Sequence, residues 1–116
     1  MKYFSYIFLG DIMIVKEGRI VDNNLSLDTV EVVLDNTTLL IISGYGGFAM
    51  CGALNVDVYN QLAKKGRNVL CMRAIGVKTL EDLYDAKIED LSDYAISLGL
   101  TKGMYVKDAF KKISIQ

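Results

Sequence analysis

The most unusual residues of this chain lie between Gly44 and Asn55, in the stretch Gly-Tyr-Gly-Gly-Phe-Ala-Met-Cys-Gly-Ala-Leu-Asn. Gly46 and Gly47 have no side chain, so another backbone or a ligand could approach closely there. Gly52 leads into a helical pattern, and the N-terminal end of a helix favours an anion. The stretch is neither a P-loop nor a dinucleotide-binding fingerprint. Two interpretations remain, a structural turn with a capped helix and a contact with a phosphate or carboxylate.

Cys51 lies just before this expected helix, in a position where cysteines can be reactive. The chain contains no histidine, so no Cys-His or Ser-His-Asp arrangement is possible. A nucleophilic or redox-active Cys51 would depend on the helix end and on a cation such as Arg73 or Lys78. The alternative is that Cys51 is a small core residue, and the apolar surroundings of Cys71 indicate a core position as well.

Arg73 and Lys78 follow an apolar run that is typical of a central strand, residues 68–75. Ligands of layered α/β proteins usually bind where strands end, and a guanidinium group suits a carboxylate or phosphate. The alternative is a structural ion pair of Arg73, for which three acidic residues are candidates: Asp57, Glu81 and Asp82. The acidic residues between 81 and 93 are otherwise interpreted as solvated helix faces.

The composition removes several classes of function. The 116 residues carry a net charge of −1 and show no basic excess, so nucleic acid is not an expected partner. Two cysteines without histidine make a poor zinc site, and no calcium-loop spacing is present. We therefore expect no metal site and no cofactor.

The apolar run Tyr3–Leu9 is too short to span a bilayer, which needs about 20 residues. No small-residue cleavage site follows it, so it is interpreted as a first β-strand rather than a signal peptide. We expect a cytoplasmic protein without a membrane partner. The run carries more large apolar side chains than one strand of a small sheet can bury. Either C-terminal helices or a second copy of the chain, in a homodimer or higher homo-oligomer, could cover it.

The first half of the chain has the residue pattern of β-strands. A tight turn is expected at Glu17-Gly18, and Asp35-Asn36 predicts a two-residue hairpin. Five segments are expected to be strands: 6–15, 19–21, 29–34, 37–42 and 47–51.

The second half has helical spacing on either side of the 68–75 strand. Asn55 is expected to cap a helix that Gly66 ends. The apolar positions of this helix, Val58, Leu62 and Ala63, recur at helical spacing. Thr79 and Asp82 resemble a capping box. Three further helices are expected at about 79–85, 88–98 and 106–113. Inward positions of the last one are Val106, Ala109, Phe110 and Ile113.

These elements predict an α+β fold over a single domain, residues 1–116. Its sheet would be a mostly antiparallel meander, interrupted by one β-α-β crossover through the helix that follows Asn55. The C-terminal helices would pack on the sheet.

Three blocks of this chain resemble the YunC-like family of small bacterial and archaeal proteins: residues 50–56, 73–79 and 98–104. The resemblance runs from about Thr29 to Ile113 and implies an α+β fold without implying an activity. Asn55 stands where the family usually has Asp, which favours a capping role over acid-base or metal chemistry. Cys71-Met72 replaces a small residue and Gly, and Tyr105 replaces a Ser that would cap the last helix.

The sequence thus leads to two functional hypotheses. The first is a binding or regulatory module for a small anionic metabolite at the Gly44–Asn55 turn. Its candidate ligand-binding residues are Gly46, Gly47, Cys51, Gly52, Asn55, Arg73 and Lys78. The alternative is an enzyme or redox protein in which Cys51 is the reactive thiol.

Overall fold

A computed structural model describes residues 2–9, as backbone, and residues 14–115. Over this part the chain forms one seven-stranded sheet and four helices. The strands are β1 (Lys2–Leu9), β2 (Ile14–Asp22), β3 (Leu25–Val33), β4 (Thr38–Gly44), β5 (Gly47–Cys51), β6 (Leu70–Ala74) and β7 (Asp90–Leu91). The helices are α1 (Asp57–Ala63), α2 (Leu80–Asp85), α3 (Asp93–Ser97) and α4 (Val106–Ser114).

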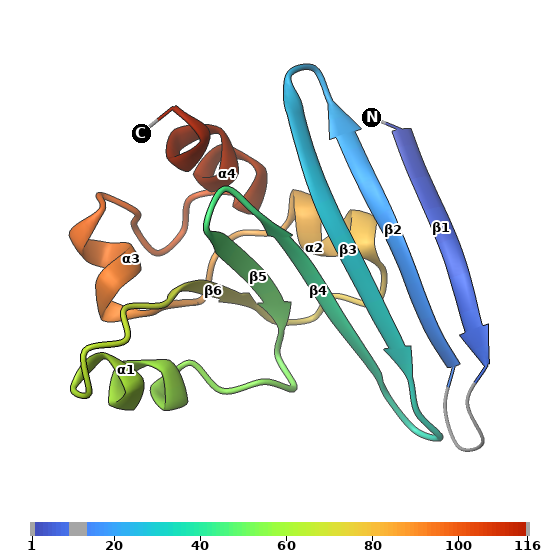
Figure 1. Cartoon of the computed structure of the whole chain (residues 1–116), viewed down its shortest axis with the longest axis horizontal. Coiled ribbons are helices and arrows are strands. Elements are labelled where there is room, and N and C mark those ends of the chain that lie inside the picture. Colours follow the sequence, from blue (N-terminus) through green and yellow to red (C-terminus); the bar gives the residue numbers. More distant parts are fainter. Residues whose placement is uncertain (1, 10–13, 116) are drawn as a thin grey trace.

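The strands lie in the sheet in the order in which they follow one another in the chain. All neighbouring pairs are antiparallel except β5 and β6, which are parallel and joined through α1. Figure 1 shows β1 and β2 at one side of the molecule, while helices gather around the half that contains β4, β5 and β6. The predicted α+β meander with one crossover is therefore confirmed.

The N-terminal strands begin and end elsewhere than the sequence pattern predicted. Residues 6–15 belong to two strands, because β1 ends at Leu9 and β2 begins at Ile14. Glu17-Gly18 is not a turn, since Gly18 lies within β2 opposite Thr29 of β3. The chain instead turns after Asp22, where Asn23 has a φ of 56°, a left-handed conformation that asparagine tolerates better than most residues.

The N-terminal run Tyr3–Leu9 lies in β1, as expected for a first strand. The aromatic side chains of this run lie outside the described part of the structure. The hypothesis that a second copy of the chain covers them therefore stays a prediction. Within the described residues, each helix falls short of the length and apolar composition required to cross a membrane.

The glycine-rich stretch folds as a hairpin that joins β4 to β5. Its two turn residues, Tyr45 and Gly46, have φ values of 54° and 80°, which identify the mirror-image type of turn that matches strand twist. At Gly47 a Cβ atom would lie 2.5 Å from Cδ2 of Leu70. The side chain of Leu70 thus occupies the space that the glycine leaves. The predicted hairpin at Asp35-Asn36 is confirmed between β3 and β4.

The crossover helix α1 begins two residues after the expected cap. Asn55 Oδ1 accepts a hydrogen bond of 2.9 Å from the backbone N–H of Asp57, while Val56 occupies the N-cap position. Gly66 ends the helix with a φ of 83°, as predicted. Val58, one of the apolar positions at helical spacing, is 54% exposed and does not face the core. Its neighbours Val56 and Tyr59 make the contacts with β5 and β6 instead.

The capping box of Thr79 and Asp82 at the start of α2 is confirmed. The expected helix over 88–98 is wrong, because this segment contains β7 and the short helix α3. The backbone N–H groups of Glu89 and Ser92 donate to the carbonyl oxygens of Arg73 and Cys71 across the sheet. These cross-strand bonds take N–H groups that a helix would use.

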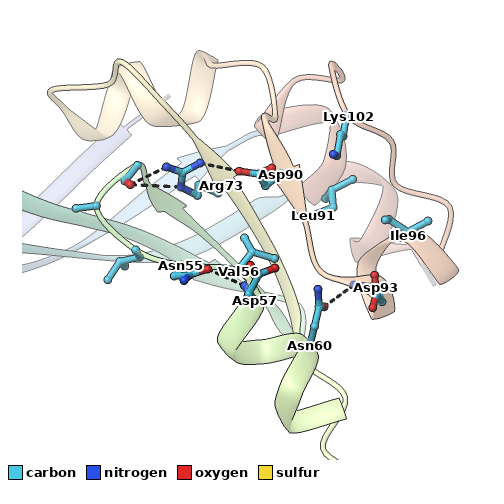
Figure 2. A pocket seen from close by; sticks show the side chains of 13 residues that line it. Asn55, Val56, Asp57, Asn60, Arg73, Asp90, Leu91, Asp93, Ile96 and Lys102 are labelled. Atoms are coloured by element: carbon cyan, nitrogen blue, oxygen red, sulfur yellow. Dashed lines mark hydrogen bonds and ion pairs between the residues drawn. The ribbon is translucent and has the colours of Figure 1, made fainter. Parts of the chain in front are cut away.

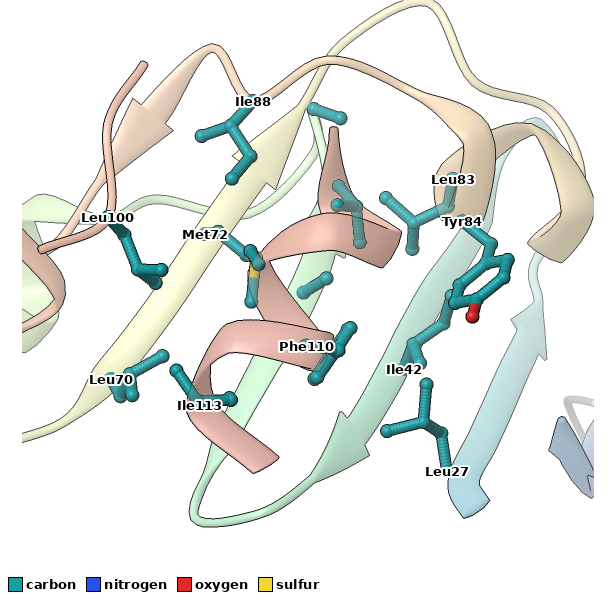
Figure 3. Close-up of a cluster of buried hydrophobic side chains, with 14 of the residues drawn as sticks. Leu27, Ile42, Leu70, Met72, Leu83, Tyr84, Ile88, Leu100, Phe110 and Ile113 are labelled. Atoms are coloured by element: carbon teal, nitrogen blue, oxygen red, sulfur yellow. The ribbon is translucent and has the colours of Figure 1, made fainter. Parts of the chain in front are cut away.

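The main hydrophobic core lies between the sheet and the helices α2 and α4 (Figure 3). Helix α4 directs toward it the four residues predicted to be inward, Val106, Ala109, Phe110 and Ile113, all of which are buried. Tyr105 occupies the N-cap position of α4 without a side-chain cap bond. Strand β6 is buried on both faces, because a second cluster around Met50, Val56 and Cys71 lies on the other side of the sheet.

We expect Phe110→Ala to lower the free energy of unfolding by about 3–5 kcal/mol, because it leaves a cavity under a fully buried ring. Urea denaturation followed by circular dichroism measures this change. Ile115→Ala is the control, because Ile115 follows α4 and is 85% exposed. Equal effects of the two substitutions would contradict the placement of α4 on the sheet.

A buried tyrosine joins α2 to the end of β2. The hydroxyl of Tyr84 donates a 2.7 Å hydrogen bond to Oδ2 of Asp22. Burial, this hydrogen bond and the negative charges of Asp22, Asp85 and Asp108 raise the pKa of Tyr84 far above its usual range. The folded protein therefore retains the phenol proton at a pH where the unfolded chain has lost it.

The sign of this linkage predicts alkaline instability. The contribution of the Tyr84 hydroxyl group to the free energy of unfolding is complete below the pKa of tyrosine in the unfolded chain, about 10. It is lost as the pH rises above that value. We expect the unfolding free energy of Tyr84→Phe to fall less steeply than that of the wild type above pH 10. Parallel slopes in denaturation series at pH 8 to 11 would contradict this. Burial also raises the pKa of Cys71, which accounts for part of the slope in both proteins.

Candidate functional site

A pocket of about 580 Å³ lies where the parallel strands β5 and β6 end (Figure 2). We call it the strand-end pocket. Four parts of the chain line it: the segment 52–57 with Asn60 of α1, Arg73 of β6, residues of β7 and α3, and Lys102. It forms here because the β5–α1 loop leaves the sheet beside the end of β6, while β7 and α3 close the other side.

Arg73 is held by two neighbouring segments of the pocket wall. Its Nε and Nη2 atoms donate to the carbonyl oxygen of Gly52 at 3.3 and 2.9 Å. Its Nη1 atom lies 2.6 Å from Oδ2 of Asp90, which is directly opposite Arg73 in the β6–β7 ladder. The proposed ion-pair partners Asp57, Glu81 and Asp82 were therefore wrong. An arginine has five N–H donors, and these bonds use three, so two remain available.

Gly52 provides the close approach that Arg73 needs. A Cβ atom at this position would lie 3.3 Å from Cγ2 of Ile75 and 3.6 Å from Nη2 of Arg73. The first distance is tighter than most side-chain contacts, so a larger residue would push against the guanidinium group or Ile75. The glycine therefore helps to hold the β5–α1 loop against the end of β6.

Two asparagine side chains connect the elements on the other side of the pocket. Asn55 Oδ1 bonds the first turn of α1, and Asn60 Oδ1 accepts a 2.9 Å hydrogen bond from the backbone N–H of Asp93. The second bond ties α1 to the beginning of α3. Within residues 14–115 neither side-chain NH₂ group has a protein partner, so both can donate to a bound molecule.

Charges of both signs line the strand-end pocket. Asp57 and Asp93 lie in the first turns of α1 and α3, and Lys102 follows α3; all three are exposed. Figure 2 shows Asp57 and Asp93 on either side of Asn60, while Lys102 lies at the opposite side of the pocket. No ion pair of these three side chains is present in the described part of the chain.

The structure brings three of the predicted site residues together and separates the others. Gly52, Asn55 and Arg73 line the strand-end pocket. Gly46 and Gly47 lie at the opposite end of β5, which at about 3.3 Å per residue is roughly 15 Å away. The Gly44–Asn55 stretch is therefore two turns joined by a strand, and one ligand contacting both ends would have to span that strand. Lys78 and Cys51 do not line the pocket.

Both cysteines are free and buried. Cys51 is 5% exposed, and its Sγ atom accepts a hydrogen bond of 3.4 Å from the backbone N–H of Leu40. Cys71 is fully buried, and burial raises the pKa of its thiol. Each thiol thus has the surroundings of a core residue.

Several residues of the site were missed in the sequence, chiefly Asp90, Asp93 and Lys102. The acidic pair was interpreted as part of a solvated helix because the strand β7, two residues long, was not predicted. Ser92, which lies between them, could have indicated that a new helix begins at this point. Its hydroxyl group accepts from the backbone N–H of Ala95, as an N-cap does. It also accepts from the backbone N–H of Cys71 in β6 and donates to the carbonyl oxygen of Val69, just before β6.

Comparison with known proteins places the chain in a family. A family model described as a domain of unknown function, DUF1805, matches residues 50–113. The chain belongs to the DUF1805 family. It is 36% identical over 84 residues to the uncharacterized protein YunC of Bacillus subtilis. This alignment covers 72% of this chain and 82% of YunC. The predicted YunC-like membership is confirmed.

A solved structure has the same fold. The crystal structure of TA1206, a protein of unknown function from Thermoplasma acidophilum, matches with a TM-score of 0.72 and 26% identity. The match covers 97% of this chain and 96% of TA1206. The DUF1805 match runs from Met50 in β5 to Ile113 in α4, so it contains every residue that lines the strand-end pocket.

We expect both thiols to react slowly with iodoacetamide at pH 7.5 in the native protein and rapidly in urea, because the native sulfur atoms are buried. Mass spectrometry of Cys51→Ala and Cys71→Ala assigns each modification. Native-state alkylation of Cys51 at the rate of an unfolded cysteine would contradict its burial and support a reactive thiol.

Proposed function

We propose that this member of the DUF1805 family is a binding module for a small metabolite that carries a negatively charged group, and that the metabolite binds in the strand-end pocket. The observation that carries the proposal is the meeting of Gly52, Arg73 and Lys102 in a pocket of about 580 Å³. This volume is within the usual range of small-molecule sites. The pocket also lies at the carboxyl ends of parallel strands, where layered α/β folds commonly bind ligands.

The anionic group would bind to Arg73 and Lys102. Because Arg73 is already fixed by Gly52 and Asp90, its two remaining N–H groups lose little freedom when a ligand arrives. Its side chain is 25% exposed, so the guanidinium group is accessible from the pocket. Lys102 adds a second positive charge, whose contribution to binding is reduced by its exposure to solvent.

The enzymatic alternative has less support than the binding function. Cys51 points into the core region beside Leu40 rather than lining the strand-end pocket. The pocket itself contributes three carboxylates, Asp57, Asp90 and Asp93, and Asp90 is already paired with Arg73.

We expect a phosphate- or carboxylate-bearing metabolite to raise the melting temperature in a thermal-shift screen of anionic metabolites. A ligand at one hundred times its Kd would stabilise the protein by about 2.7 kcal/mol, which is several degrees for a domain of this size. Lys102→Ala should weaken the affinity for the same compound by about 1.5- to 5-fold, the effect of an exposed charge.

Lys65→Ala is the matched control, since Lys65 is also exposed and lies outside the pocket. Arg73→Lys removes the planar, forked set of N–H donors of the guanidinium group and keeps the positive charge. The proposal is overturned if a broad anionic library gives no concentration-dependent shift, or if the Lys102 and Arg73 variants bind every hit as tightly as the wild type does.

A further inference from the structure

We infer that the ligand of the strand-end pocket carries a cationic amine in addition to its anionic group. The inference rests on the proposed function and specifies the chemical class of the ligand: an amino acid, an amino-alkyl phosphate or a similar zwitterion. Its basis is the arrangement of charges around the pocket.

The pocket has more carboxylates than would suit the binding of a purely anionic ligand. Two cationic residues line it, Arg73 and Lys102, together with three carboxylates, Asp57, Asp90 and Asp93. Arg73 and Asp90 form an ion pair. One positive charge therefore faces two carboxylates that have no ion pair in the described part of the chain. A ligand with anionic groups alone would be attracted by Lys102 and by the two free N–H donors of Arg73, and it would be repelled by the two carboxylates.

The two unpaired carboxylates lie on one side of the pocket. Asp57 and Asn60 are three residues apart on α1 and so share a helix face, and Asn60 bonds the backbone N–H of Asp93. Lys102 lies on the opposite side of the pocket (Figure 2). Positive and negative charges are thus separated across the space that a ligand would occupy, an arrangement complementary to a molecule with an ammonium group at one end and an anion at the other.

A structural role could also explain these carboxylates. Asp57 and Asp93 each stand in the first turn of a helix, where a negative charge stabilises the helix dipole. Glu81 also lies in the first turn of a helix, as the second residue of α2, and it is outside the pocket. It therefore provides a control that loses a first-turn charge without changing the pocket.

The first experiment compares zwitterions with their two halves by ¹H–¹⁵N NMR titration, which detects weak binding. The probes are the ω-amino acids from glycine to 6-aminohexanoate, and O-phosphoethanolamine. Each is compared with the acid or alkyl phosphate that lacks the amine, and with the amine that lacks the anion. We expect at least one zwitterion to bind with roughly tenfold lower Kd than either half, with shifts at residues around the pocket.

The second experiment uses Asp57→Asn, Asp93→Asn and the double variant. We expect each to weaken zwitterion binding by about 1.5- to 5-fold and to strengthen binding of the matching anion, because a repulsive charge is removed. Glu81→Gln should change neither. Weaker binding of the zwitterion together with stronger binding of the anion identifies an ammonium site. A purely structural loss would weaken the binding of both ligands.

Other outcomes overturn the inference. If anions bind as tightly as their zwitterions, or if no probe binds at millimolar concentration, the ammonium site is wrong. The first result leaves the proposed function standing, because an anion still binds in the pocket. The proposed function itself fails through the broad anionic screen and the Lys102 and Arg73 variants, so the two failures are distinguishable.

Discussion

The guanidinium group of Arg73 holds together the part of the structure on which the site depends. It is anchored on the parallel strand β6, and it binds the carbonyl oxygen of Gly52 after β5 and the carboxylate of Asp90 in β7. Three segments that are distant in the sequence are thus joined by one planar group. The partial burial of this group gives its hydrogen bonds more strength than exposed pairs have. The pocket wall is formed by the backbone that these bonds position.

The elements that local patterns determine were predictable from the sequence. The turn at Asp35-Asn36 and the inward face of α4 depend on turn chemistry and helical spacing within a few residues, and both were confirmed. The turn at Glu17-Gly18 was wrong, because glycine also occurs inside strands and the pairing of β2 with β3 overrode the local signal. The segment 88–98 has helical spacing, but the N–H groups of Glu89 and Ser92 bond to β6, a contact with residues far away in the sequence.

The candidate site was predictable to a smaller extent. Gly52, Asn55 and Arg73 stood out because of their residue types and their places at the expected ends of strands, and they do meet in the pocket. The partner of Arg73 was not predictable, because Asp90 becomes its neighbour only through the ladder between β6 and β7. Gly46 and Gly47 stood close to Gly52 in sequence, yet an intervening strand directs the two turns to opposite ends of the sheet.

The sequential order of the strands also has a consequence for how the molecule assembles. From β2 to β5 every connection is a hairpin, so these strands can pair one after another through short loops that close quickly. The crossover from β5 to β6 is longer, and β7 and α3 can dock only after β6 is in place. Non-local pairings of this kind are the slow steps of folding. The meander thus supplies a template, and the half of the molecule that contains the strand-end pocket is completed on its edge.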